Sequence, residues 1–70
     1  MHSITIIRQL KNRRESVGIT QETLADLSGV GLRTLKQLES GKGNPTLQTM
    51  AQIADVLGLE LRLEIKRLNS

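Results

Sequence analysis

The feature that most restricts the fold of this chain is a pattern of small, turn-forming and apolar positions over residues 21–40. Ala25 stands where two packed helices would approach most closely, and Gly29 stands where a tight turn needs a positive φ. Apolar residues at the remaining inward positions would close the pair against the rest of the domain: Leu24, Val30, Leu35 and Leu38. The pattern predicts two short helices that cross steeply around a tight turn.

The ends of these two helices are marked by capping and helix-breaking residues. Thr20 opens the first of them and Gly29 stops it. The second is expected over residues 32–40. The buried side of the pair is expected to comprise Leu24, Ala25, Leu27, Leu35 and Leu38.

One more helix is expected on each side of this pair. A stripe at helical spacing predicts a helix over residues 4–17, ended by Gly18, with Ile4, Ile7, Leu10 and Arg14 on one face. Residues 41–45 have the composition of a loop. Thr46 then caps a fourth helix that Gly58 terminates, with the apolar stripe Leu47, Met50, Ile53, Ala54 and Leu57.

After Gly58 the apolar period changes from that of a helix to that of a strand. Apolar and charged residues alternate without exception: Leu59, Glu60, Leu61, Arg62, Leu63, Glu64, Ile65 and Lys66. We therefore expect a mainly α chain, with a four-helix domain over residues 1–58 and one β-strand over residues 59–67. A single strand leaves its backbone groups unpaired, so two copies are expected to form an antiparallel ribbon in a homodimer. Two alternatives are that the strand folds back on its own chain or pairs with a different protein.

Charge selects one register for such a ribbon. With the two-fold axis at Leu63, Glu60 faces Lys66 of the second copy and Arg62 faces Glu64, so every polar pair is opposite in sign. Moving the axis to Arg62 or to Glu64 places like charges opposite each other. Each favourable pair contributes only about 0.2–1 kcal/mol, but like pairs cost similar amounts. The pattern predicts the register centred on Leu63, with residues 59–66 as the dimer interface.

Composition excludes several classes of function. The chain of 70 residues has no cysteine, and its one histidine is His2, so disulfides and thiolate or histidine metal sites are excluded. No catalytic constellation or phosphate-binding glycine motif is present, so we expect no enzyme and no cofactor. The absence of a long apolar run and of a signal-peptide pattern predicts a cytoplasmic protein without a membrane partner.

The net charge of +3 is unevenly distributed. Seven of the ten basic residues but only four of the seven acidic ones precede position 45, whereas residues 45–70 are balanced. A basic first part suits a polyanionic partner, although many basic proteins bind no nucleic acid.

Residues 4–58 resemble the Cro/C1-type (XRE) helix-turn-helix domains of phage repressors and bacterial regulators. The resemblance is carried by Leu10-Lys11 with Arg14, Gly18-Ile19-Thr20-Gln21, Leu24-Ala25, Ser28-Gly29-Val30, Leu38-Glu39-Ser40-Gly41 and Asn44-Pro45-Thr46-Leu47. It implies the lambda-repressor-like fold and binding of double-stranded DNA. In detail the chain is similar to the HipB-like members, whose chain ends in a short strand.

The resemblance implies that the helix from Leu32 lies in the major groove. Its outward residues would contact bases, Arg33 pairing with a guanine, Gln37 with an adenine and Leu32 touching a thymine methyl, together with Lys36. Leu32 can instead pack locally across the turn, and Arg33 and Lys36 can instead contact phosphates without contacting bases.

The resemblance also implies phosphate contacts and one buried ion pair. Gln21 matches a phosphate-binding glutamine at a helix N-terminus, where free N–H groups attract anions. The whole set of phosphate candidates is Thr20, Gln21, Gly31, Thr34, Ser40, Lys42, Asn44 and Thr46. Gly31 departs from the Ser or Thr often found there, which removes one side-chain contact. Arg14 and Glu39 match a structural ion pair, and the place of Arg14 on an apolar stripe supports that role independently.

Together these features predict a transcriptional regulator, a repressor that binds a palindromic operator as a homodimer. The alternative is an antitoxin similar to HipB that represses its own operon and also binds a toxin protein. A third possibility is a protein-only interaction module, against which the polar outer face of the third helix argues.

Overall fold

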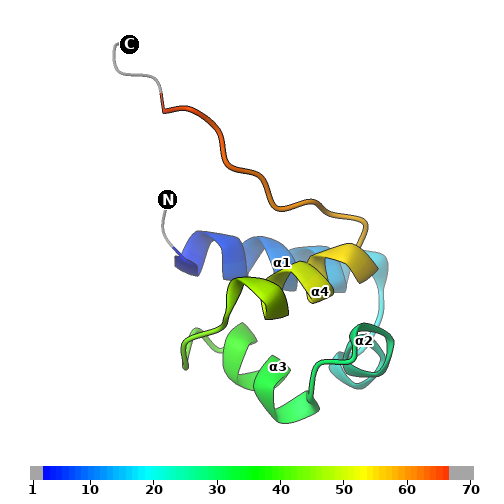
Figure 1. Ribbon diagram of the computed structural model, residues 1–70. Helices are drawn as coiled ribbons and strands as arrows, with labels where there is room; N and C mark the ends of the chain where they lie inside the picture. The colour runs from blue at the N-terminus through cyan, green and yellow to red at the C-terminus, as the bar shows by residue number, and fades with distance from the viewer. Residues whose placement is uncertain (1–2, 67–70) are drawn as a thin grey trace.

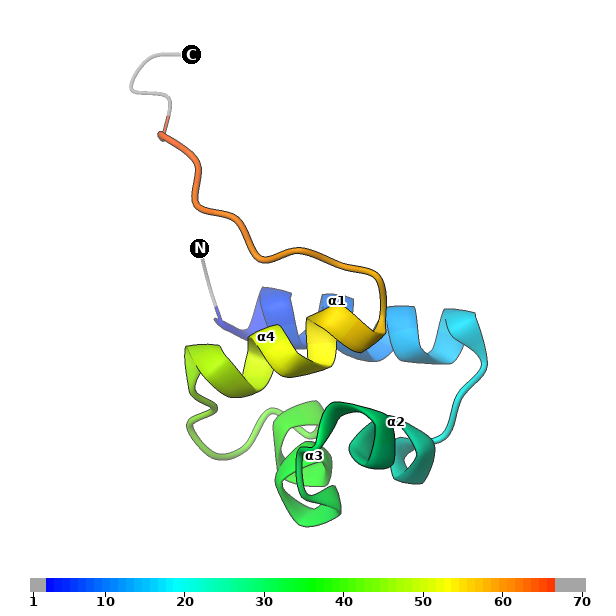
Figure 2. The same cartoon turned by 45° about the vertical axis from the view of Figure 1, so that its right-hand side comes forward.

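The computed structural model describes residues 3–66, which form four helices followed by an extended C-terminal segment (Figure 1). The helices are α1 (Ser3–Val17), α2 (Gln21–Ser28), α3 (Leu32–Glu39) and α4 (Leu47–Val56). Helices α1 and α4 lie on one side of the body, and α2 and α3 lie on the other (Figure 2). The predicted four-helix domain is therefore confirmed.

Local signals fix the ends of the helices in the central pair. The Thr20 hydroxyl accepts a hydrogen bond from the Thr23 backbone N–H at 3.1 Å, so Thr20 caps α2 as expected. Gly29 ends α2 with φ +76°, a conformation that a side chain would strain. Helix α3 ends at Glu39, one residue before the expected end, and Ser40 is its capping residue.

The core is aliphatic and lies where the four helices meet. It contains no aromatic residue, because the chain has none. Leu24, Leu35 and Ile53 are completely buried. The remaining members of the core are Ile7, Leu10, Ala25, Val30, Leu38, Met50, Ala54 and Leu57.

The prediction that Leu27 lies on the buried side of α2 is wrong. Its side chain is 63% exposed, and the buried residues of the helix are Leu24, Ala25 and Ser28. The stripe that faces α3 and α4 is therefore one position further round the helix than expected. Ser28 can be buried because its hydroxyl donates to the Ala25 carbonyl and accepts from the Val30 N–H.

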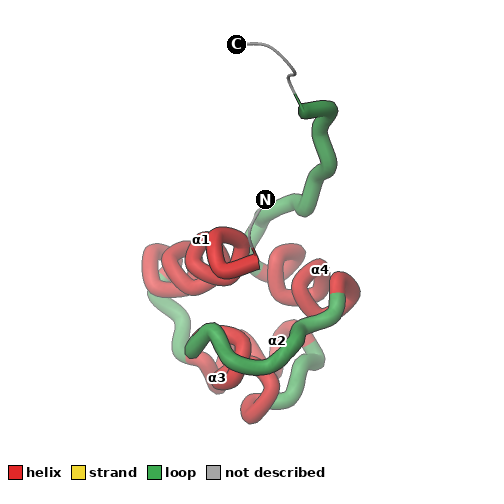
Figure 3. The backbone as a smooth tube through the Cα atoms, turned by 90° about the vertical axis from the view of Figure 1, so that its left-hand side faces the viewer, coloured by secondary structure: helices red, strands yellow, loops and turns green. Residues whose placement is uncertain are grey.

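Residues 59–66 form no strand, which corrects the prediction for the single chain (Figure 3). The physical reason is the absence of a backbone partner, since a strand exists only through hydrogen bonds to a neighbour. The segment nevertheless keeps the alternation of the sequence where it touches the body. Leu59 and Leu61 are partly buried against the core, whereas Glu60 and Arg62 are exposed. The last residue of the expected strand, Arg67, lies outside the described residues.

Two further observations concern residues 3–66 as a whole. No helix among them is long and apolar enough to cross a bilayer. Within the same residues, no group of three or more His, Cys, Asp or Glu side chains is placed to hold a metal ion.

Candidate nucleic-acid interface

Helix α3 presents a polar face on the outside of the molecule. Arg33, Lys36 and Gln37 are all exposed, and they share one side of the helix because they are three and four residues apart. Leu35 and Leu38 lie on the other side and are 0% and 1% exposed. The buried pair fixes the rotation of the helix, so the polar face has a defined direction.

Two residues near the N-terminal end of α3 that were predicted to contact DNA differ in exposure. Leu32 is partly buried and packs against the core, which is the local role considered as its alternative. Part of its side chain remains exposed, and only that part can touch a ligand. Thr34, a phosphate candidate, is exposed.

Gly31 precedes α3 and makes no side-chain cap for it. The first N–H groups of a helix have no partner within the helix, so those of α3 are free to bind an acceptor from outside. A Cβ at Gly31 would meet only the Thr34 hydroxyl, at 3.9 Å. A serine would therefore fit at position 31. Lack of space does not explain why this chain has a glycine there, without a side chain to contact DNA.

Beneath the start of α2 lies a network of charged hydrogen bonds. The guanidinium of Arg14 donates two hydrogen bonds to the Glu39 carboxylate, from Nε to Oε2 at 2.7 Å and from Nη2 to Oε1 at 3.0 Å. The two side chains are only 12% and 4% exposed. The third nitrogen, Nη1, donates to the Ile19 carbonyl at 2.8 Å. The structure thus brings together the two residues expected to form an ion pair.

This arrangement satisfies both charges. The hydrogen bond to Glu39 raises the pKa of Arg14 above its ordinary value, against a smaller opposing effect of burial. The guanidinium therefore stays protonated throughout the physiological pH range. Burial without such a partner would be strongly unfavourable.

Gln21 joins the same network. Its side-chain Nε2 donates to Glu39 Oε1 at 3.0 Å. Gln21 was expected to bind a DNA phosphate, but one of its two side-chain amide protons is already donated to Glu39. The second proton remains for an anion, together with the backbone N–H groups in the first turn of α2 that Thr20 does not cap.

The other threonine and serine candidates are exposed but already take part in local hydrogen bonds. The hydroxyls of Thr20 and Thr46 each accept from a backbone N–H and donate to the threonine three residues later. The Ser40 hydroxyl donates to the Gln37 carbonyl at 2.8 Å. Their first role is to end or begin helices.

The loop after α3 adds one exposed positive charge, Lys42, next to the end of that helix. Lys42 and Asn44 are exposed. The Lys42 backbone N–H donates to the Gln37 carbonyl at 3.0 Å, which holds the loop against the end of α3. Gly41 and Gly43 both have positive φ, so this path needs glycine.

Two positioning contacts were not predicted. Arg13 Nε donates to the Leu57 carbonyl at 2.9 Å and thereby ties the end of α4 to α1. Gln52 Nε2 donates to the Ser28 carbonyl at 3.3 Å, next to the turn between α2 and α3. No local signal reveals either contact, because each depends on where another helix ends.

Helix α3 and the C-terminal segment lie on opposite sides of the molecule (Figures 1 and 2). The segment leaves the end of α4 and runs away from α2 and α3. A ligand on α3 and a partner on the segment can therefore be bound at the same time.

Comparison with known proteins gives one family match. A model of a family described as helix-turn-helix matches residues 10–63. The chain is 38% identical over 56 residues to the cryptic phage CTXphi transcriptional repressor RstR of Vibrio cholerae, a match covering 80% of this chain and 50% of that protein.

Two other relatives are described as uncharacterized HTH-type transcriptional regulators. The one from Haemophilus influenzae is 33% identical over 86% of this chain and 61% of its own length. The one from Methanothermobacter thermautotrophicus is 41% identical over 80% of this chain and 77% of its own length. The matched regions thus span between half and about three quarters of these three relatives.

Proposed function

Because the chain belongs to this helix-turn-helix family, which is non-enzymatic, we propose that it is a transcriptional regulator that binds double-stranded DNA and acts as a repressor. The observation that carries the proposal is the outer face of α3, where Arg33, Lys36 and Gln37 are all exposed above a fully buried inner face. The repressor role is inferred from the relative in Vibrio cholerae, which is a transcriptional repressor. Such a protein would work in the cytoplasm, where the chromosome is.

In this proposal, α3 lies in the major groove, and each of its outward residues makes a different contact with the DNA. Arg33 pairs with a guanine and Gln37 with an adenine, because each side chain offers two hydrogen bonds in the required geometry. Lys36 contacts a base or the neighbouring phosphate, and the exposed part of Leu32 touches a thymine methyl.

The residues around α3 hold the DNA backbone. Gln21 uses its second amide proton, and the free N–H groups after Gly31 face a phosphate. Lys42 supplies a positive charge from the loop. The remaining phosphate contacts are Thr20, Thr34, Ser40, Asn44 and Thr46.

Selection of bound duplexes from a random pool tests this function. We expect a palindromic consensus with half-site centres about 34–36 Å apart, one turn of DNA. Binding should weaken steeply with salt, since it releases counterions from phosphates. Recovery of no consensus, together with weak, salt-insensitive binding, would favour the protein-only module instead.

Arg33→Ala is expected to relax the consensus at one base pair of each half-site, with a loss of about 1–3 kcal/mol of discrimination there. The matched variant Lys42→Ala, also an exposed cation, should weaken all sequences alike and reduce the salt dependence. Both are measured by titrating the consensus and its single-base variants. If Arg33→Ala weakens every sequence equally, Arg33 contacts phosphate and not a base.

A homodimer is the second part of the proposal, since one helix-turn-helix unit makes few contacts and a two-fold pair matches a palindrome. Residues 59–66 of two copies pair as an antiparallel ribbon with the axis at Leu63. In the single chain Arg62 Nε lies 3.4 Å from Glu60 Oε2, but both side chains are more than 70% exposed, so this pair holds the segment only weakly. Arg62 is therefore available for Glu64 of a second copy.

Arg62→Glu is expected to weaken dimerisation by about 1–4 kcal/mol, because two attractive pairs per dimer become repulsive. The double variant Arg62→Glu with Glu64→Arg restores opposite charges in this register and should recover the dimer. Sedimentation at micromolar concentration measures both. An unrescued double variant would exclude the axis at Leu63.

The HipB-like alternative is an antitoxin that also binds a toxin protein. It uses the same DNA face and the same dimer, so neither distinguishes it from a plain repressor. Co-purification with the product of the neighbouring gene would separate the two.

A further inference from the structure

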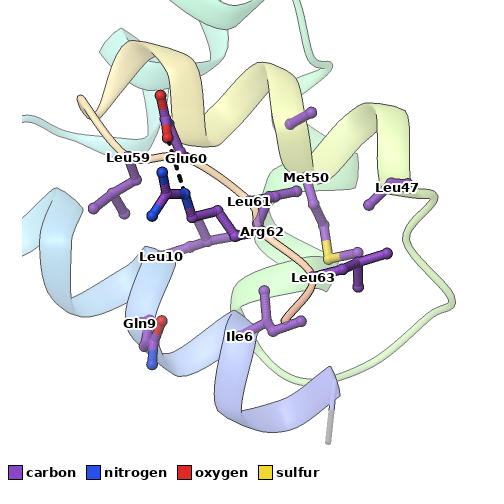
Figure 4. A pocket seen from close by; sticks show the side chains of 11 residues that line it. Ile6, Gln9, Leu10, Leu47, Met50, Leu59, Glu60, Leu61, Arg62 and Leu63 are labelled. Atoms are coloured by element: carbon purple, nitrogen blue, oxygen red, sulfur yellow. Dashed lines mark ion pairs between the residues drawn. The ribbon is translucent and has the colours of Figure 1, made fainter. Parts of the chain in front are cut away.

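A groove of about 560 Å³ lies between α1, α4 and the C-terminal segment (Figure 4). Its walls are mainly apolar, and the polar residues that line it are Gln9, Glu60 and Arg62. The apolar wall residues come from all three elements: Ile6, Leu10, Leu47, Met50, Ala51, Leu59, Leu61 and Leu63. Leu47 is 69% exposed, so the part of the wall formed by the start of α4 is left largely uncovered by the chain itself.

The C-terminal segment fills only the first part of this groove. Leu59 and Leu61 are partly buried in it, whereas Leu63 and Ile65 are 96% and 97% exposed. The segment has by then left the helical body (Figure 2). Half of its apolar face therefore has no cover within the described residues of one chain.

We infer that the uncovered part of the groove is filled by Ile65 of a second copy of this chain. The inference rests on the dimer proposed above. With the axis at Leu63, Ile65 of one copy lies directly opposite Leu61 of the other on the same face of the ribbon. Their Cβ atoms are then about 4.5–5.5 Å apart. Because that face of Leu61 is turned into the groove, Ile65 of the second copy is turned into it too. Leu47, at 69% exposure, is the large apolar residue of the helical walls with free surface to receive it.

The charges of the segment favour this orientation over its reverse. Glu60 and Arg62 reach the groove only at its edge, since their side chains are 79% and 73% exposed. The pairs that they form with Lys66 and Glu64 of the second copy thus stay in water, and only leucine and isoleucine enter the groove. A ribbon turned over would bury charged side chains against Leu47 and Met50, which is strongly unfavourable.

The two-fold symmetry doubles the effect. Each copy supplies its Ile65 to the groove of the other, so the groove is complete only in the dimer. The ribbon is then held against both helical bodies, and the relative position of the two α3 helices is fixed.

Cross-linking between single-cysteine copies tests the inference, and the chain is suited to it because it has no cysteine of its own. Copies with Leu47→Cys and with Ile65→Cys, carrying tags of different size, are mixed and treated with a short bis-maleimide. We expect a cross-linked species that contains one copy of each. Mixing Gln48→Cys with Ile65→Cys is the control, since Gln48 is exposed on α4 but does not line the groove, and should give little product.

A third variant separates failure of the inference from failure of the dimer. Leu63→Cys alone should cross-link to itself, because Leu63 meets its own copy at the axis. If Leu63→Cys links and the Leu47–Ile65 pair does not, the ribbon forms away from the groove and the inference is overturned while the dimer stands. If neither links and the mass in solution is that of a monomer, the proposed dimer is overturned as well. All four positions are exposed, so these cysteines leave the core intact.

Discussion

Replacing Glu39 with glutamine is expected to destabilise the fold by about 3–5 kcal/mol, because it leaves the buried guanidinium of Arg14 without a counter-charge. The side chains have the same shape, so the loss reports the charge. Native proteins have only about 0.05–0.15 kcal/mol of stability per residue, and a 70-residue chain loses most of its margin. Urea unfolding followed by circular dichroism measures the change.

The matched control for this variant is Glu22→Gln, an exposed glutamate on α2, which should stay within about 0.5 kcal/mol of the parent. Replacing both Arg14 and Glu39 with methionine should recover much of the loss, since no charge is then buried unpaired. A Glu39→Gln variant as stable as the parent would mean that the ion pair does not hold the fold together.

Leu35→Ala is the second change with a large expected effect, a loss of about 2–5 kcal/mol. Leu35 is completely buried and joins α3 to the core. The control is Leu27→Ala, the same chemical change at a side chain that is 63% exposed, which should cost little. Thermal unfolding of the two variants gives the comparison. Equal losses would contradict the burial described for α2.

The Leu35 variant also has a functional readout. The substitution leaves a cavity on the inner side of α3, opposite Arg33, Lys36 and Gln37. The helix thereby loses the packing that sets the direction of its polar face. DNA binding should therefore fall even at temperatures at which the variant remains folded.

The helices could be predicted from the sequence because their signals are local. A threonine cap, a glycine stop and an apolar stripe lie within a few residues of each other, and each constrains the backbone directly. This is why the bounds of α2 and α3 agree with the prediction to within one residue.

The buried side of α2 was harder, because in an eight-residue helix several rotations place leucines inward. Leu24 and Leu27 both suit a buried stripe, and the choice depends on where α3 and α4 lie. The structure buries Ser28 instead of Leu27, which the apolar pattern disfavours. Only the hydrogen bonds of the Ser28 hydroxyl make that choice acceptable.

The candidate site divides in the same way. The exposed face of α3 follows from helical spacing and the buried leucines. The bond from Gln21 to Glu39 and the bond from Arg13 to the Leu57 carbonyl join residues 18 and 44 positions apart, and nothing in the sequence near them indicates the partner. The strand proposed for the C-terminal segment requires a second chain as its partner, so a single copy cannot display it.

The alternating burial of Leu59, Glu60, Leu61 and Arg62 has a consequence for how this protein can change during evolution. Adding or deleting one residue between Leu57 and Leu61 would exchange the two faces of the segment and place charges where leucines now lie. Adding or deleting two residues would keep each face in place and only move the segment along its length. Among related chains that use the same segment, insertions of an even number of residues should therefore be tolerated here, and insertions of an odd number should be absent.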